Sequence, residues 1–330
     1  PAVAVREAPG KGMATFAQLR MRAGDLIVRE RPAVVSRLGQ PPDRRRFKAL
    51  PLEEQKAVMG LCDAYAQGAE GKTLEGIVRT NALPRGLKQE ETVLCPLASR
   101  FNHSCAPNAE YLWSESAFVE EVRAVRDIHP GEEVCVNYFG DAIRFPTSVR
   151  QAHLRDGFRF DCRCPVCCAG DAASDERRQR LVRLGEEILG CADRPEQGVR
   201  MAEEMLELMQ QERIGAPRTV AQVCNDGFEL SLLVGDPSEV QYWAHMSYEA
   251  HRLGWGEDYE MTRRMKQYAQ RPPALASTRE RQASATGSSR AGAASCTGGV
   301  RAQGAAVGHS GAAACSAAPD GHVDDGAAGR

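Results

Sequence analysis

The stretch Arg100-Phe101-Asn102-His103-Ser104-Cys105-Ala106-Pro107-Asn108 is dense in side chains that form hydrogen bonds or ligate metals. By itself it fits a polar turn. It also fits a Cys/His nucleophile pair, but that interpretation is weak, because such partners are brought together by the fold and are seldom adjacent in the chain. Two segments further along the chain bear on its meaning.

The first of these segments is Gly131-Glu132-Glu133-Val134-Cys135-Val136-Asn137-Tyr138, which begins in the turn at His129-Pro130-Gly131. The apolar pattern predicts a strand over 134–138 and another over 117–122. Taken alone, Tyr138 reads as an aromatic strand residue that packs in a core. Short strands and turns from about 93 to 140 predict a compact β-rich domain.

The second segment is Cys162-Arg163-Cys164-Pro165-Val166-Cys167, whose spacing lets the chain wrap one tetrahedral Zn²⁺ with three thiolates. Cys105 is the candidate for the fourth ligand, although Cys168 or a His could compete. The alternatives are a chance cluster and a nucleic-acid-binding zinc knuckle. The mixed charge of residues 155–161 argues against the knuckle.

Composition narrows the function classes. The chain has 330 residues, a hydrophobic fraction of 42% and a formal net charge of −2, so coating nucleic acid or an anionic membrane is not expected. No run approaches the ~20 apolar residues of a membrane span, and no secretion signal is visible. The 12 cysteines therefore favour thiols and metal over disulfides. The chain begins with Pro1 and not Met, which leaves room for a missing N-terminal piece.

The remaining pattern divides the chain. Residues 1–35 read as strand, turn and strand, and residues 43–80 and 146–158 read as helical. Helical periodicity covers 175–268 and is broken before the prolines at 195, 217 and 237, which predicts antiparallel helices. After about 270 the composition shifts to Ala, Gly and Ser, so we expect a disordered tail.

Taken together, these segments carry a resemblance to a known family. Residues 102–108, 131–138 and 160–167 resemble, in order, the signatures of SET-domain methyltransferases. Gly10-Lys11-Gly12-Met13 resembles the family's opening Gly-x-Gly turn. The subgroup resembled is SMYD-like, whose zinc site joins the Cys of the first signature to the later Cys-x-Cys-x-x-Cys. No series of paired cysteines occurs between about 35 and 93, so the chain resembles the SET proteins without a MYND finger.

The resemblance implies an S-adenosylmethionine-dependent protein lysine N-methyltransferase. It implies cofactor contacts by Lys11, Gly12, Met13, Asn81, Asn102, His103, Tyr138 and Phe160. Tyr138 would be the catalytic-site tyrosine, and Zn²⁺ would be held by Cys105, Cys162, Cys164 and Cys167. Phe158 stands where the family often has a second tyrosine in the lysine channel. Loss of that hydroxyl could change how many methyl groups are added, weaken activity, or mark a protein that binds without catalysing.

The expected fold is α+β. It comprises a SET domain at 1–145 with a helical insert at about 43–92, a post-SET zinc-binding segment at 146–170, a helical tetratricopeptide-like region at 175–268 and a tail at 270–330. The expected partner is a protein substrate, a histone or another lysine-bearing protein, in the nucleus or cytoplasm. The helical region could also bind a peptide. The alternative is a non-catalytic SET-fold interaction module with structural zinc.

Overall fold

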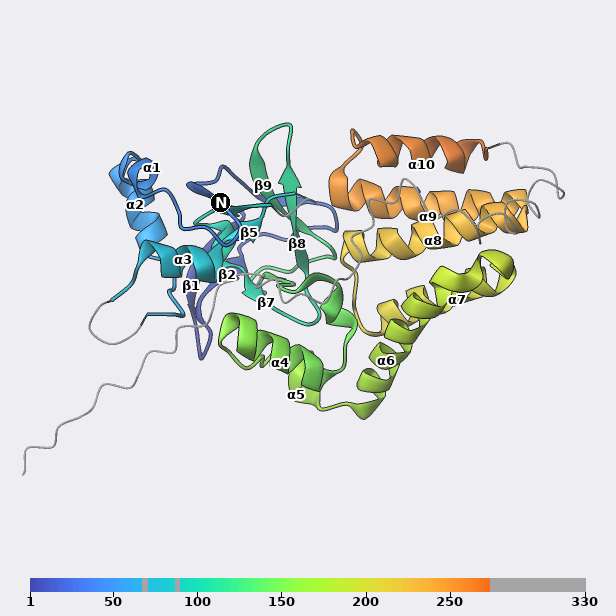
Figure 1. Ribbon diagram of the computed structural model, residues 1–330, viewed down its shortest axis with the longest axis horizontal. Helices are drawn as coiled ribbons and strands as arrows, with labels where there is room; N and C mark the ends of the chain where they lie inside the picture. Colours follow the sequence, from blue (N-terminus) through green and yellow to red (C-terminus); the bar gives the residue numbers. More distant parts are fainter. Residues whose placement is uncertain (67–70, 87–89, 274–330) are drawn as a thin grey trace, which may run out of the picture.

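The computed structural model describes residues 1–66, 71–86 and 90–273. Short strands occupy the middle of the molecule, with helices α1 to α3 on one side and α6 to α10 on the other (Figure 1). The β-rich core, the cysteine cluster and the helical C-terminal region confirm the predicted α+β class. The expected tail lies almost wholly outside the described residues. Within those residues, no helix is both long and apolar enough to cross a membrane.

The strands pair into small sheets. They are β1 (Val3–Ala8), β2 (Gly12–Ala17), β3 (Leu26–Glu30), β4 (Val34–Arg37), β5 (Leu83–Pro84), β6 (Glu91–Leu94), β7 (Asn102–His103), β8 (Ala109–Ser114), β9 (Val119–Ala124) and β10 (Cys135–Val136). The orders are β1-β2, β3-β9-β8 and β4-β6-β5, all antiparallel, and β10-β7, which is parallel.

The β1-β2 hairpin places Lys11 beside the Gly131–Tyr138 segment. Gly10 and Gly12 both have φ of 71°, a left-handed conformation that favours glycine, and they turn the chain around Lys11. β2 continues along the segment through a bond from Val134 N to Thr15 O at 2.8 Å. The Gly-x-Gly turn and the later signature are therefore neighbours in space.

The parallel β7-β10 pair joins two signatures directly, because Asn102 is in register with Cys135 and His103 with Val136. The predicted strand over 134–138 is shorter in the structure. Asn137 ends it by accepting from Phe139 N at 3.1 Å through its own side chain, a turn that competes with strand pairing. The strand expected at 117–122 is β9, which starts later because the preceding residue, Phe118, has φ of 53°.

The residues predicted to be helical from about 43 to 80 are divided among three helices. These are α1 (Arg44–Lys48), α2 (Leu52–Met59) and α3 (Leu74–Asn81). Pro51 separates the first two, since proline cannot donate to the preceding turn. The Thr73 side chain caps α3 by accepting from Gly76 N at 2.9 Å.

The C-terminal half is helical as predicted. Its helices are α4 (Thr147–Phe158), α5 (Pro165–Ala169), α6 (Ala172–Glu187), α7 (Pro195–Gln211), α8 (Pro217–Val234), α9 (Pro237–Trp255) and α10 (Glu260–Gln270). Proline starts α7, α8 and α9, which confirms the predicted breaks. Gly227 lets α8 and α9 approach closely, because a Cβ there would lie 2.4 Å from the Trp243 ring.

Candidate active site and metal centre

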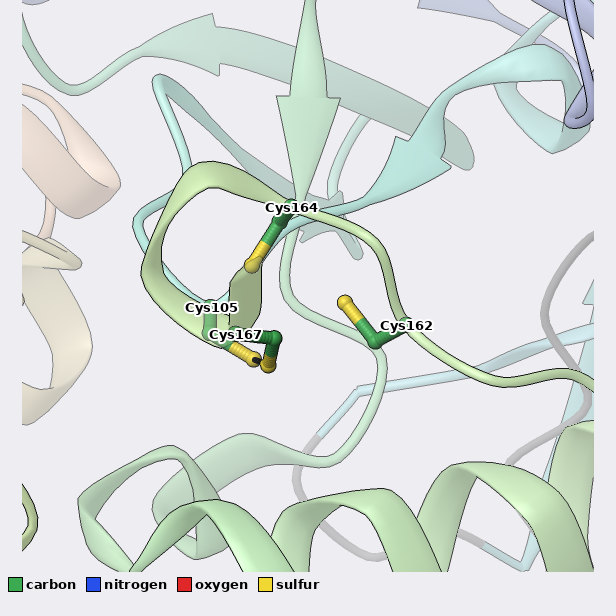
Figure 2. A group of neighbouring side chains, drawn as sticks. All are labelled: Cys105, Cys162, Cys164 and Cys167. Carbon is green, nitrogen blue, oxygen red and sulfur yellow. Dashed lines mark hydrogen bonds between the residues drawn. The ribbon is translucent and has the colours of Figure 1, made fainter. Parts of the chain in front are cut away.

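Four cysteine side chains from separate parts of the chain converge (Figure 2). Cys105 follows β7, Cys162 and Cys164 lie between α4 and α5, and Cys167 lies on α5. Their sulfur atoms all lie within 4.8 Å of one another, and all four are free thiols. The chain reaches the cluster by reversing at Arg159, which ends α4 in the left-handed conformation.

This donor set fits a structural zinc ion. Tetrahedral Zn²⁺ with Zn–S bonds of ~2.3 Å holds its sulfurs ~3.8 Å apart, and the Cys105 and Cys167 sulfurs are 3.6 Å apart. In the described part of the chain, it is the one group of three or more His, Cys, Asp or Glu side chains arranged to hold a metal. Cys168, the competing candidate from the sequence, is exposed and outside the group.

A buried arginine supplies positive charge to the cluster. Arg150, on α4, is fully buried, and its Nε lies 3.2 Å from the Cys105 sulfur and an Nη lies 3.7 Å from that of Cys167. Burial tends to lower the pKa of Arg150, but the two thiolates outweigh it and raise the pKa. A buried guanidinium needs an anionic partner, and the cysteine sulfurs would provide one as the thiolates of a metal centre.

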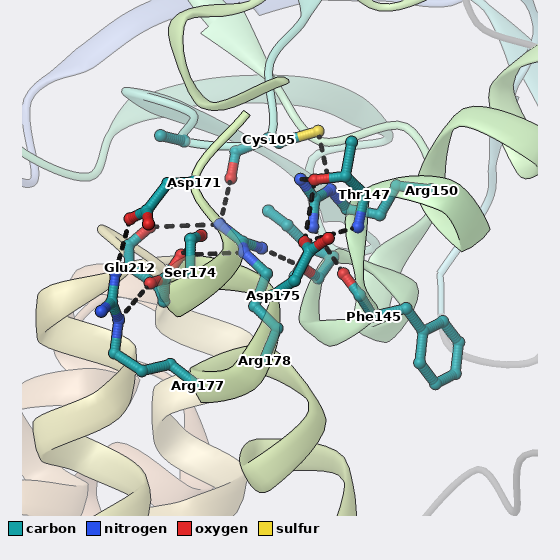
Figure 3. A network of polar contacts seen from close by, with 12 residues as sticks. Cys105, Phe145, Thr147, Arg150, Asp171, Ser174, Asp175, Arg177, Arg178 and Glu212 are labelled. Carbon is teal, nitrogen blue, oxygen red and sulfur yellow. Dashed lines mark hydrogen bonds and ion pairs between the residues drawn. The ribbon is translucent and has the colours of Figure 1, made fainter. Parts of the chain in front are cut away.

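A second buried arginine ties the cluster to the helical region (Figure 3). Arg178, on α6, donates to the carbonyl of Cys105 at 3.3 Å and from Nε to Glu212 at 2.9 Å. Glu212 follows α7 and also accepts from Ser174 and Arg177, each at 2.5 Å. Helices α6 and α7 are therefore anchored to the loop that carries Cys105.

His103 connects the cysteine cluster to Tyr138. Its Nδ1 accepts from the Tyr138 backbone N at 3.2 Å, so the neutral ring carries its proton on Nε2, which lies 3.4 Å from the Cys105 sulfur. Burial lowers the pKa of His103 to about 3. The ring is therefore neutral at pH 7 and points its N–H at the Cys105 sulfur, as expected for a side chain that supports a metal ligand.

Tyr138 lies in an aromatic group. It is 5% exposed and donates from its hydroxyl to the carbonyl of Phe101 at 2.7 Å. Its ring centroid lies 5.2 Å from that of Phe158 and 6.4 Å from that of Phe160. Phe160 also lies 6.4 Å from His103. The structure thus brings Tyr138, Phe158, Phe160 and His103 together, and the Tyr138 hydroxyl is aimed at a backbone carbonyl.

Lys11 and Asn102 meet at a carboxylate that the sequence did not single out. Lys11 Nζ contacts Glu133 Oε2 at 2.6 Å, and Asn102 Nδ2 donates to Glu133 Oε1 at 3.0 Å. Burial lowers the pKa of Lys11, but the hydrogen bond and charge of Glu133 raise it overall. Gly12 and Met13 begin β2 beside Lys11, and the Met13 side chain is 42% exposed.

Asn81 is fully buried at the end of α3. Its Nδ2 donates to the carbonyls of Cys62 and Ile77, while its Oδ1 has no hydrogen-bond partner among the described residues. Its backbone carbonyl accepts from Ser99, in the turn before Phe101, at 3.1 Å. A buried amide oxygen without a partner is costly, so it is consistent with a site that a ligand completes.

Sequence reasoning missed Glu133, Arg150, Arg178 and Glu212. Glu133 stands in the quoted signature, but nothing in the sequence says which of its neighbouring glutamates faces Asn102. Each arginine shares its helix with exposed or partly exposed arginines, Arg155 on α4 and Arg177, Arg180 and Arg183 on α6, so periodicity does not separate a buried arginine from a solvated one.

Comparison with known proteins assigns a family to the part of the chain that carries β2, β7, β10 and Tyr138. A SET domain family model matches residues 12–139. The histone-lysine N-methyltransferase set5 of Schizosaccharomyces pombe is 27% identical over 273 residues, which is 81% of this chain and 83% of that protein.

Two mammalian relatives match shorter stretches. Mouse protein-lysine N-trimethyltransferase SMYD5 is 44% identical over 106 residues, or 30% of this chain and 25% of that protein. Pig N-lysine methyltransferase SMYD2 is 32% identical over 156 residues, or 47% of this chain and 34% of that protein. The chain thus matches a quarter to about a third of the length of these two relatives. Residues 12–139 thus form a SET domain, and the chain is related to the Set5 and SMYD protein-lysine methyltransferases.

Proposed function

We propose that the chain methylates a lysine side chain of a histone at the site that Tyr138, Phe158 and Phe160 surround. Support for a histone substrate comes from the similarity to the yeast histone-lysine N-methyltransferase, which covers most of both chains. A histone substrate would place the protein in the nucleus. Other proteins with accessible lysines remain the runner-up substrate class.

The observation that carries the proposal is the Tyr138 hydroxyl, buried and held 2.7 Å from the Phe101 carbonyl. S-adenosylmethionine, which a SET domain uses, supplies a methyl group on a positively charged sulfur. Tyr138 and the Phe101 carbonyl place fixed oxygen atoms around that position. Fixed dipoles stabilise a transition state most where charge changes during the reaction.

The aromatic walls of the site would also prepare the acceptor. A lysine amine is protonated at pH 7 and cannot attack in that form. Burial between Phe158 and Tyr138 disfavours the charged amine and lowers its pKa. Holding the neutral amine in line with the methyl group supplies much of the remaining rate.

For the cofactor, we assign Lys11, Gly12, Met13, Asn81, Asn102, His103, Tyr138 and Phe160. The unpartnered Asn81 Oδ1 supports the assignment of a polar part of the ligand near α3. The Lys11–Glu133 ion pair supports the assignment of a zwitterionic part of the ligand beside it. Phe160 would cover the adenine. We also propose that the SET domain spans 1–145 with its insert at about 43–92, that 146–170 is the post-SET zinc-binding segment, and that 175–268 is a helical, tetratricopeptide-like region that could bind a peptide.

The test combines labelled S-adenosylmethionine, recombinant histones and the Tyr138→Phe variant. The wild-type chain should label a histone, and the variant should lose on the order of 10²-fold in kcat while its dissociation constant for the cofactor changes by less than about twofold. Labelling of other proteins from a cell extract, with none of histones, would reject the histone substrate. Failure to bind S-adenosylmethionine in calorimetry would instead favour the non-catalytic interaction module.

We further propose that Cys105, Cys162, Cys164 and Cys167 hold one Zn²⁺. Metal binding is coupled to folding in sites of this kind, and Phe160 lies on the segment that leads into the cluster. Cys164→Ser should therefore lower zinc content, melting temperature and cofactor affinity together. The matched control is Cys168→Ser, because Cys168 is exposed beside the cluster. A folded Cys164→Ser chain that keeps full zinc content would reject the ligand assignment.

A further inference from the structure

The carboxylate of Glu133 links its own segment of the chain to two others. One oxygen contacts Lys11 Nζ from the β1-β2 turn, and the other accepts from Asn102 Nδ2 on β7. The side chain of Glu133 is 17% exposed, and Asn102 is 6% exposed. The carboxylate therefore sits between two residues assigned above to the cofactor and uses both of its oxygens on them.

The backbone of Glu133 is fixed on two sides. On one side it forms a β-bridge with Phe16 in β2. On the other, Asn108 Nδ2 donates to the Glu133 carbonyl at 2.9 Å, and Asn108 Oδ1 accepts from Cys135 N at 2.7 Å. A carboxylate on such a braced segment is held in place before any ligand arrives.

This arrangement orients the Asn102 amide. Because Nδ2 is committed to Glu133, the amide oxygen Oδ1 points away from the carboxylate, and no hydrogen bond to it is formed by the described residues. Beside it, the ammonium of Lys11 is held against Glu133 and is about one-third exposed. The pair has no net charge but presents a cation next to an amide acceptor.

An α-amino acid has the complementary pattern, since its carboxylate matches Lys11 and its ammonium matches Asn102 Oδ1. We propose that Glu133 is a positioning residue that orients Asn102 and Lys11 for the amino-acid end of S-adenosylmethionine. This rests on the proposed function. Glu133 acts through its two partners and not on the reacting atoms.

The test measures binding of two ligands that differ only at that end. S-adenosylhomocysteine has the α-amino acid, whereas 5′-methylthioadenosine lacks it, and both are uncharged at sulfur. Glu133→Gln keeps the shape but removes the charge and turns one acceptor into a donor, which then faces the ammonium of Lys11 or the Asn102 amide. By calorimetry on the full chain, its Kd for S-adenosylhomocysteine should rise about 10-fold or more, as expected for lost charge-assisted bonds. Its Kd for 5′-methylthioadenosine should change less than about twofold.

The control is Glu132→Gln, at the adjacent position. Glu132 pairs with Arg126 and receives Asn108 Nδ2 at 3.2 Å, and its carboxylate contacts neither Lys11 nor Asn102. The affinity of this variant for both ligands should stay near that of the wild type. Equal weakening of both ligands in Glu133→Gln would show a general loss of structure and overturn the proposal.

A double variant tests whether Glu133 acts through Asn102. If it does, adding Asn102→Ala to Glu133→Gln should weaken S-adenosylhomocysteine little further, so the two effects should be clearly less than additive. Fully additive effects, or an unchanged Kd in Glu133→Gln, would overturn the inference while leaving the proposed function standing. If the wild-type chain binds neither ligand, the proposed function fails as well.

Discussion

Arg150 donates to the sulfur of Cys105 at 3.2 Å, although both side chains are fully buried. Its other donors reach the Phe145 carbonyl and the Thr147 hydroxyl. Among the described residues, no carboxylate forms an ion pair with Arg150, so its charge is balanced by sulfur. With the proposed Zn²⁺ bound, the ion and four thiolates would carry two negative charges, and Arg150 would offset one of them.

Arg150→Met should destabilise the chain and loosen its metal. Removing one partner of a buried charge pair costs about 3–5 kcal/mol of unfolding free energy. The readouts are denaturant unfolding and the rate of zinc transfer to a chelator. Arg155→Met is the control, because Arg155 lies on the same helix in an exposed pair with Asp161 and should change the unfolding free energy by ~1 kcal/mol or less. Equal zinc release from both variants would contradict a role at the cluster.

Phe158→Tyr should reduce the number of methyl groups added to each lysine. Phe158 is 5% exposed, and its ring lies 5.2 Å from that of Tyr138. A second hydroxyl in this space would hydrogen-bond the amine or a water and leave less room for an amine that already carries methyl groups. Mass spectrometry of the product should show a shift towards lower methylation states with the total turnover retained. An unchanged product distribution would show that Phe158 does not line the lysine channel.

Much of this arrangement could be predicted from the sequence. The prolines at 195, 217 and 237 start helices because they fit the first turn and no later one. The spacing of Cys162, Cys164 and Cys167 predicts three zinc ligands, and a tetrahedral ion needs a fourth. That need leaves Cys105, Cys168 and the histidines as candidates, and the resemblance to SET-domain proteins selects Cys105.

Other features depend on tertiary contacts that no local rule contains. Glu133 and Glu132 are identical neighbours, yet only the fold decides that Glu133 faces Lys11 while Glu132 faces Arg126. In the same way, only the packing of α6 against the Cys105 loop separates the buried Arg178 from the partly exposed Arg177.

Glu120 should make stability depend on pH. Its burial raises its pKa to about 8, which Arg218 only partly opposes, and its Oε2 has no partner among the described residues. Between pH 4.5 and about 8 the folded chain keeps a proton that the unfolded chain releases, so stability falls as pH rises, by up to ~1.4 kcal/mol per pH unit.

Glu120→Gln should make this dependence less steep and raise the unfolding free energy at pH 8 relative to the wild type. Part of the slope below pH 7 should remain, because burial also raises the pKa of Glu110 to about 7. Urea unfolding of both chains at pH 6, 7 and 8 measures the difference. Glu115→Gln serves as the control, since the Glu115 side chain is 67% exposed. A slope between pH 7 and 8 that is as steep in Glu120→Gln as in the wild type would assign the pH dependence to other groups.

Glu212→Gln should destabilise the junction between the helical region and the cysteine cluster. Glu212 is 4% exposed and balances Arg178, which is fully buried and also holds the Cys105 carbonyl. Without the carboxylate, the Arg178 charge stays buried and unpaired, which costs about 3–5 kcal/mol.

The control is Glu204→Gln, whose pair with Arg180 is 35–40% exposed and is worth ~1 kcal/mol or less. Since Arg178 reaches the Cys105 loop, zinc should also leave Glu212→Gln faster than Glu204→Gln. Destabilisation without faster zinc release would show that the ion pair stabilises the helices alone and does not support the metal centre.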